Sequence, residues 1–158
     1  MRLVNMIAED FTNYKVCSMF LGFPSCTWKC ERDCGRTGLC QNAILARSPS
    51  VWVPIEHIIN TYTENPLSKA IVCGGLEPFD SWSELLELVS EFRKVTEDPV
   101  IIYTGYYKDE IRKQVKELQK YPNIIIKFGR FVPDQESHYD EVLGVKLASD
   151  NQYAERIS

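Results

Sequence analysis

Four of the six cysteines of this chain lie within fifteen residues, at Cys26, Cys30, Cys34 and Cys40. Thiols this close together in a sequence either form disulfides or bind a soft metal. A disulfide framework suits a small secreted domain, whereas this chain has 158 residues and no signal-like apolar stretch near its start. We therefore expect a cytoplasmic protein whose clustered, reduced cysteines hold a metal or do chemistry.

The composition excludes two classes of partner. With 44% hydrophobic and 25% charged residues, the chain is expected to form a single domain over residues 1–158. Its net charge of −4 and its lack of a basic stripe argue against nucleic-acid binding. No stretch approaches the roughly 20 apolar residues that cross a membrane, so no membrane association is expected.

Apolar runs alternate with amphipathic segments along the chain, which predicts an α/β fold. We expect buried strands at residues 15–23, 70–73, 99–104 and 123–128, with a last strand at 141–147. Helices are expected at residues 54–65, 81–95 and 108–121, the second of them beginning with the capping-box spacing of Ser81 and Glu84. Strands that are apolar throughout favour parallel pairing with helical crossovers.

The length of the chain limits how many strand-helix units it can hold. A complete eight-unit barrel takes roughly 250 residues, or about 31 per unit, so 158 residues allow about five units. We therefore predict a partial (β/α) barrel of about five to six parallel strands. Ligands of such sheets bind where the strands end. The cysteines, Gly74-Gly75, Thr104-Gly105 and Gly129 each follow an expected strand, so we expect them at one rim.

Several short motifs follow the strands in a fixed order. After the cysteines come Gly74-Gly-Leu-Glu77-Pro, Tyr103-Thr-Gly-Tyr106, Phe128-Gly-Arg-Phe131 and Ser149-Asp-Asn-Gln152. Together they resemble the radical S-adenosylmethionine enzymes, and most closely the glycyl-radical activating enzymes that serve anaerobic ribonucleoside-triphosphate reductase. The resemblance extends from about residue 11 to residue 152.

The resemblance implies a fold, two cofactors and two protein partners. The fold is a partial barrel, and the cofactors are a [4Fe-4S] cluster with three cysteine ligands and S-adenosylmethionine at its open iron. Reductive cleavage gives a 5′-deoxyadenosyl radical that takes a hydrogen atom from a glycine of a partner protein, here an anaerobic ribonucleotide reductase. The resemblance also implies an electron donor such as flavodoxin or ferredoxin.

The cysteine spacing departs from the CxxxCxxC of the resembled family. Cys26 and Cys30 fit this pattern, but Asp33 occupies the third position. The third ligand is then either Cys34 or Cys40. We favour Cys40, because Cys40-Gln-Asn42 reproduces the Cys-x-Asn that often follows the third ligand in the family, which makes residues 31–39 an inserted loop.

By the same resemblance, the strand-end residues bind S-adenosylmethionine. Gly74 and Gly75 permit a close approach of the backbone, and Glu77 is our candidate partner for the ammonium group, although Leu76 separates it from the glycines. Thr104 and Gly105 are expected beside the ribose or the carboxylate. Lys127 and residues 149–152 are further candidates for this pocket.

Other interpretations of these residues remain open. Four cysteines can form a structural zinc site, although spacings of three, three and five residues differ from the usual CxxC pairs. The chain could then be a non-catalytic interaction module, or a small radical enzyme with another protein or small molecule as substrate. We expect Cys17 and Cys73 to be core thiols, and His57 and His138 to lie outside the chemistry.

Overall fold

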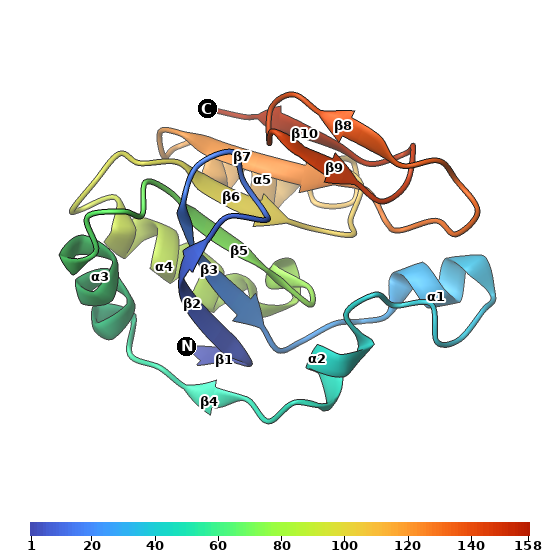
Figure 1. Cartoon of the computed structure of the whole chain (residues 1–158), viewed down its shortest axis with the longest axis horizontal. Coiled ribbons are helices and arrows are strands. Elements are labelled where there is room, and N and C mark those ends of the chain that lie inside the picture. Colours follow the sequence, from blue (N-terminus) through green and yellow to red (C-terminus); the bar gives the residue numbers. More distant parts are fainter.

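The computed structural model describes all of residues 1–158, and its centre is a six-stranded sheet (Figure 1). The strands lie in the order β10-β7-β6-β5-β3-β2. Their bounds are β2 Asn5–Asp10, β3 Ser18–Phe23, β5 Ile71–Gly75, β6 Val100–Tyr103, β7 Ile124–Phe128 and β10 Tyr153–Arg156. The four middle strands are parallel, and the two edge strands β2 and β10 are antiparallel to their neighbours.

Three helices cover one face of this sheet. They are α3 (Ile55–Glu64), α4 (Trp82–Phe92) and α5 (Arg112–Leu118), and a short 3-10 turn, η1 (Pro78–Ser81), precedes α4. Figure 1 shows α4 and α5 behind the sheet. Alternate strand residues such as Leu21, Ile102 and Ile126 pack against them in a core of 24 buried residues, as the period of two along a strand requires.

The opposite face of the sheet carries a smaller core of eight buried residues. The intervening strand residues, among them Phe20, Val72 and Ile101, pack there against Tyr14 and Leu147. Leu147 belongs to a separate two-stranded hairpin of β8 (His138–Asp140) and β9 (Val145–Leu147). Because both faces are covered, the middle strands are apolar at nearly every residue.

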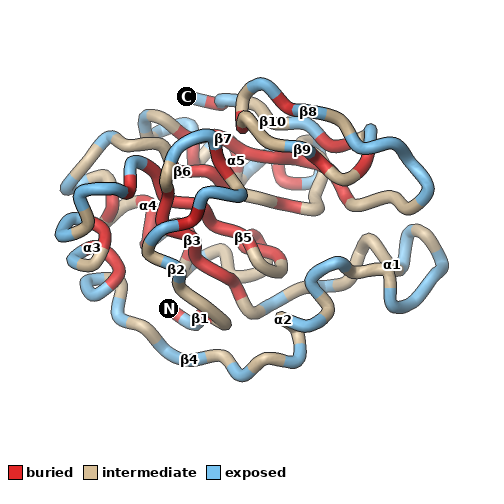
Figure 2. The backbone as a smooth tube through the Cα atoms, in the orientation of Figure 1, coloured by how far each residue is buried: buried red, intermediate tan, exposed pale blue.

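The four clustered cysteines lie outside both cores. The segment from Ser25 to Arg47, called the cysteine segment below, holds α1 (Lys29–Cys34) and α2 (Ala43–Arg47), neither of which contains a buried residue. Figure 2 shows this segment in tan and blue, the colours of partly buried and exposed residues, beside the red, buried centre of the sheet. The chain then returns through β4 (Val51–Trp52), which pairs with β1 (Arg2–Leu3).

The expected α/β class is confirmed, but the strands are not all parallel. A parallel neighbour needs a long crossover, usually a helix. Only seven residues, 11–17, join β2 to β3, so this pair is antiparallel. Residues 129–152 join β7 to β10 through the β8–β9 hairpin rather than a helix, and β10 runs antiparallel as well.

Three local predictions need correction. Ser81 makes no capping hydrogen bond, because η1 leads directly into α4 and the carboxylate of Glu77 accepts from Phe79 N instead. The helix expected at 108–121 spans only Arg112–Leu118. The strand expected at 141–147 shrinks to β9, which pairs with β8 rather than joining the main sheet.

No helix in the structure combines the length and the apolar character needed to cross a bilayer.

Candidate functional site

A cavity of about 430 Å³ lies between the cysteine segment and the carboxyl ends of the parallel strands. From the cysteine segment it is lined by Cys26, Thr27, Lys29, Cys30, Cys40, Gln41, Asn42 and Leu45. From the strand ends it is lined, among others, by Gly74, Gly75, Glu77, Thr104, Gly105, Lys127, Gly129 and Arg130. The residues expected to contact S-adenosylmethionine therefore all lie at this one cavity, namely Gly74, Gly75, Glu77, Thr104 and Gly105.

Three of the four clustered cysteines line this cavity. Cys26, Cys30 and Cys40 belong to its wall, whereas Cys34, the last residue of α1, does not. The structure does not place any three Cys, His, Asp or Glu side chains in a ready-made metal-binding arrangement. Three thiols in one cavity wall are nonetheless a donor set that fits a soft metal centre.

Burial keeps these thiols protonated in the cluster-free chain. Desolvation raises the pKa of Cys26 to about 11, and it also raises the pKa values of Cys30 and Cys40. A neighbouring thiolate at Cys40 would raise the pKa of Cys30 further. Metal binding opposes this shift, because coordination deprotonates thiols and releases their protons.

The end of β5 requires glycine at position 75. Gly75 has a φ of 84°, and a Cβ atom there would lie 2.9 Å from the Cα atom of Gly22 on β3. The backbone of β5 thus turns toward the cavity at a point where a side chain has no room. The carbonyl of Gly75 accepts a 2.6 Å hydrogen bond from Asn42 Nδ2, which ties the Cys-x-Asn sequence to this strand end.

Glu77 lies beneath the cavity and organises the end of β6. Its side chain is buried, and its Oε1 atom accepts hydrogen bonds from Thr104 Oγ1 (2.8 Å) and Phe79 N (3.2 Å). Its Oε2 atom accepts from Gly105 N at 2.8 Å. Burial raises the pKa of Glu77 to about 7, and these hydrogen bonds oppose the rise.

A buried lysine lies at the neighbouring strand end. Lys127 on β7 donates a 2.8 Å hydrogen bond to the carbonyl of Gly129. Burial lowers the pKa of Lys127 to about 8, against the attraction of Glu77. Gln152 also lines the cavity and accepts from Ser149 N, while Ser149 itself lies outside the lining.

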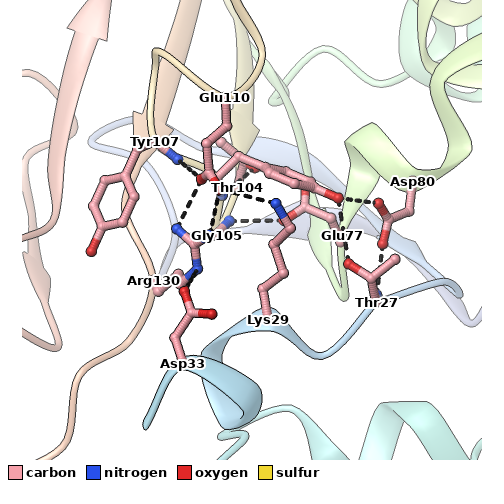
Figure 3. A network of polar contacts seen from close by, with 11 residues as sticks. Thr27, Lys29, Asp33, Glu77, Asp80, Thr104, Gly105, Tyr107, Glu110 and Arg130 are labelled. Carbon is pink, nitrogen blue, oxygen red and sulfur yellow. Dashed lines mark hydrogen bonds and ion pairs between the residues drawn. The ribbon is translucent and has the colours of Figure 1, made fainter.

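An ion-pair network joins the cysteine segment to the ends of β6 and β7 (Figure 3). Glu110 accepts from Lys29 Nζ at 2.9 Å and from both terminal nitrogens of Arg130, at 2.8 and 2.6 Å. Arg130 Nε also lies 2.8 Å from Asp33 Oδ2, but it is not aligned for a hydrogen bond, so this contact is an ion pair. The hydrogen bonds from Arg130 lower the pKa of Glu110 to about 2.

A second polar contact group holds the start of the cysteine segment. Thr27 N donates to Asp80 Oδ2 at 2.7 Å, and Tyr106 Oη donates to Asp80 Oδ1 at 2.6 Å. The sequence motifs had drawn attention to Tyr106 and Arg130, but not to Asp80 or Glu110. No motif or spacing marks these two acidic residues, since only the folded chain brings them to the cysteines.

The remaining expected residues lie elsewhere. Cys73 is fully buried in the larger core, as expected, whereas Cys17 is only half-buried, because it precedes β3 on the loop from β2. Neither His57 on α3 nor His138 on β8 lines the cavity.

The fold and the cavity define an α/β domain that presents a group of cysteines at the ends of parallel strands. The comparison with protein families is specific: the model described as a 4Fe-4S single cluster domain matches residues 15–153, which is most of the chain. The protein belongs to this family, and the match indicates iron-sulfur binding. No curated protein and no solved structure matches the chain significantly.

Proposed function

We propose that the protein is a radical S-adenosylmethionine enzyme that generates a glycyl radical on a partner protein. The observation that carries the proposal is that three cysteine thiols and the glycine-rich strand ends line the same cavity. The matched family also occurs in radical S-adenosylmethionine proteins. In this proposal the sheet is the partial barrel of that class.

Cys26, Cys30 and Cys40 are the proposed cluster ligands. All three line the cavity and Cys34 does not, which supports Cys40 as the third ligand. Asn42, two residues after Cys40, contacts the Gly75 carbonyl and so holds this part of the segment near β5. A three-cysteine set leaves one iron free to bind a substrate.

The strand ends offer groups of both signs for the zwitterionic methionine part of S-adenosylmethionine. An ionised carboxylate has about four acceptor positions, and three of those of Glu77 are taken by Thr104, Phe79 and Gly105. The fourth, on Oε2, would accept from the ammonium group. Lys127 would face the carboxylate, and the volume of about 430 Å³ suits a ligand of this size.

When bound, the cluster would supply the electron that cleaves the sulfonium to methionine and a 5′-deoxyadenosyl radical. The chain's own residues orient the cofactor and exclude competing reactions. The target would be a glycine, since a residue without a side chain lets its Cα radical flatten within the backbone. We propose an anaerobic ribonucleotide reductase as the partner and a flavodoxin or ferredoxin as the electron donor.

The position of the cavity favours a macromolecular substrate. Its lining includes the exposed residues Thr27, Gln41 and Lys146, so it opens to the surface beside the cysteine segment. A loop of another protein can reach such an opening.

Reductive cleavage of the cofactor tests the proposal. The chain is reconstituted anaerobically with iron and sulfide and mixed with dithionite and S-adenosylmethionine, and 5′-deoxyadenosine is measured by chromatography. We expect formation that depends on both iron and dithionite, with none from zinc-loaded chain. A fully loaded cluster that yields no 5′-deoxyadenosine would contradict the proposal and favour a non-catalytic cysteine-cluster module. Cleavage without radical formation on the reductase would instead indicate another substrate.

A further inference from the structure

Polar contacts, rather than a core, hold the cysteine segment on the rest of the protein. Neither α1 nor α2 buries a residue. With six residues, α1 is also far shorter than the roughly 12–15 residues that an isolated helix needs to be even marginally stable. Its position over the strand ends must therefore come from side-chain contacts with other elements.

The ion pairs of α1 converge on one carboxylate. Glu110 is fixed within its own loop, because its Oε2 atom also accepts from Tyr107 N at 2.8 Å. Its Oε1 atom accepts from Lys29 Nζ at 2.9 Å. Lys29 is the first residue of α1 and lies between Cys26 and Cys30 in the sequence, so this contact holds the turn of chain that carries both thiols.

Arg130 connects Glu110 to the other end of α1. Glu110 holds the guanidinium of Arg130 by two hydrogen bonds, of 2.8 and 2.6 Å, and the ring of Tyr107 lies 4.8 Å from it. So oriented, Arg130 pairs with Asp33, one residue before the end of α1. Bidentate pairing of this kind fixes direction as well as distance.

We propose that Glu110 is a positioning residue that holds α1, and with it Cys26 and Cys30, over the strand ends before a cluster binds. One carboxylate thereby fixes both ends of the helix, through Lys29 directly and through Arg130 to Asp33 (Figure 3). The inference needs only iron-sulfur binding, which the family match indicates, and it does not depend on S-adenosylmethionine chemistry.

Hydrogen exchange of the full cluster-free chain tests this role. In Glu110→Gln, the amides of residues 29–34 should exchange about fivefold faster, since the hydrogen bonds lost are charged but partly exposed. The matched control is Glu117→Gln on α5, which removes an ion pair with Lys120 and should leave these residues unchanged. Unchanged exchange of residues 29–34 in Glu110→Gln would overturn the proposal, as would equally accelerated exchange in β5 and β7.

A double-mutant cycle shows whether Lys29 and Glu110 act as one contact. If they do, Lys29→Met combined with Glu110→Gln should accelerate exchange less than the product of the two single effects. Strictly multiplicative effects would contradict the proposed link. As a second readout, reconstituted Glu110→Gln should lose its iron to a chelator several-fold faster than Glu117→Gln; equal loss rates would count against a positioning role. Absence of 5′-deoxyadenosine formation would contradict the enzymatic proposal without altering either readout.

Discussion

Cys34 and Cys40 flank a tight loop, and their surroundings differ. Cys34 ends α1, after which Gly35 and Gly38 adopt positive φ angles of 62° and 77° and turn the chain back. Cys40 therefore returns to the cavity, where its backbone N–H donates to Glu31 Oε1 at 3.2 Å. The loop explains how Cys30 and Cys40, ten residues apart in the sequence, could both bind one cluster.

Single cysteine variants should separate the two possible third ligands. We expect Cys26→Ala, Cys30→Ala and Cys40→Ala each to reduce the iron of the anaerobically reconstituted chain from about four atoms to nearly none, because two thiolates cannot hold the cluster. Cys34→Ala serves as the matched control and should keep its iron. Iron content and the visible absorption of the cluster measure this, and full iron in Cys40→Ala would make Cys34 the ligand.

At the scale of elements, β3 and β5 approach each other closely where they meet the cavity. Gly75 and Gly22 face one another without side chains, and the register pairs Gly22 with Gly74 and Phe23 with Gly75. This approach lets the cysteine segment leave β3 directly beside the end of β5. The shape of the cavity thus depends on the close approach of β3 and β5, which is possible because Gly22 and Gly75 have no Cβ atom.

An added methyl group at Gly75 should therefore weaken the protein. Gly75→Ala combines a positive φ of 84° with atoms of Gly22 and Phe23 at 2.9 to 3.1 Å, so we expect unfolding to require about 1–3 kcal/mol less free energy. Gly105→Ala is the control, since its Cβ would meet nothing closer than 3.5 Å. Urea unfolding compares the two, and equal stabilities would show that β5 can shift to admit the methyl group.

How far the sequence predicted these elements depended on their burial. β3 and β7 are buried at every residue and were visible as apolar runs. The edge strands β2 (NMIAED) and β10 (YAER) are partly exposed and polar, so they gave no such signal. Helix α1 (KCERDC) has no apolar face to bury, and α2 (AILAR) has only five residues, too few for hydrophobic periodicity to reveal a helix.

The candidate site could be predicted from the sequence only in part. Strand-end glycines and cysteines could be predicted because their spacing reflects local backbone needs. Glu110 and Asp80 contact the cysteine segment from 81 and 53 residues away in the sequence, so only the fold relates them to it.

At the scale of the whole molecule, the buried Glu77 should make stability depend on pH. Its pKa rises from 4.5 to about 7 on folding, chiefly through burial. Between these values the folded chain binds the proton and the unfolded chain does not, so the free energy of unfolding should fall as the pH rises. The full effect is about 3 kcal/mol.

Urea unfolding of the cluster-free chain between pH 4.5 and 7 measures this dependence. Glu77→Gln cannot titrate and should lose this fall in stability, while Glu87→Gln, an exposed residue of α4, should retain it. A slope that persists unchanged in Glu77→Gln would assign it to other groups.

The absence of buried residues from α1 and α2 has a consequence for how such proteins are recognised. Residues 31–39, between Cys30 and Cys40, form the rest of α1 and a surface loop and bury no side chain, and longer surface loops cost little free energy. An insertion there leaves the buried core unchanged, so the number of residues between the ligand cysteines can vary. The residues at the strand ends cannot vary in this way. A search for related chains should therefore rely on Gly74-Gly75 and the residues after β6 and β7, and treat the number of residues between cysteines as variable.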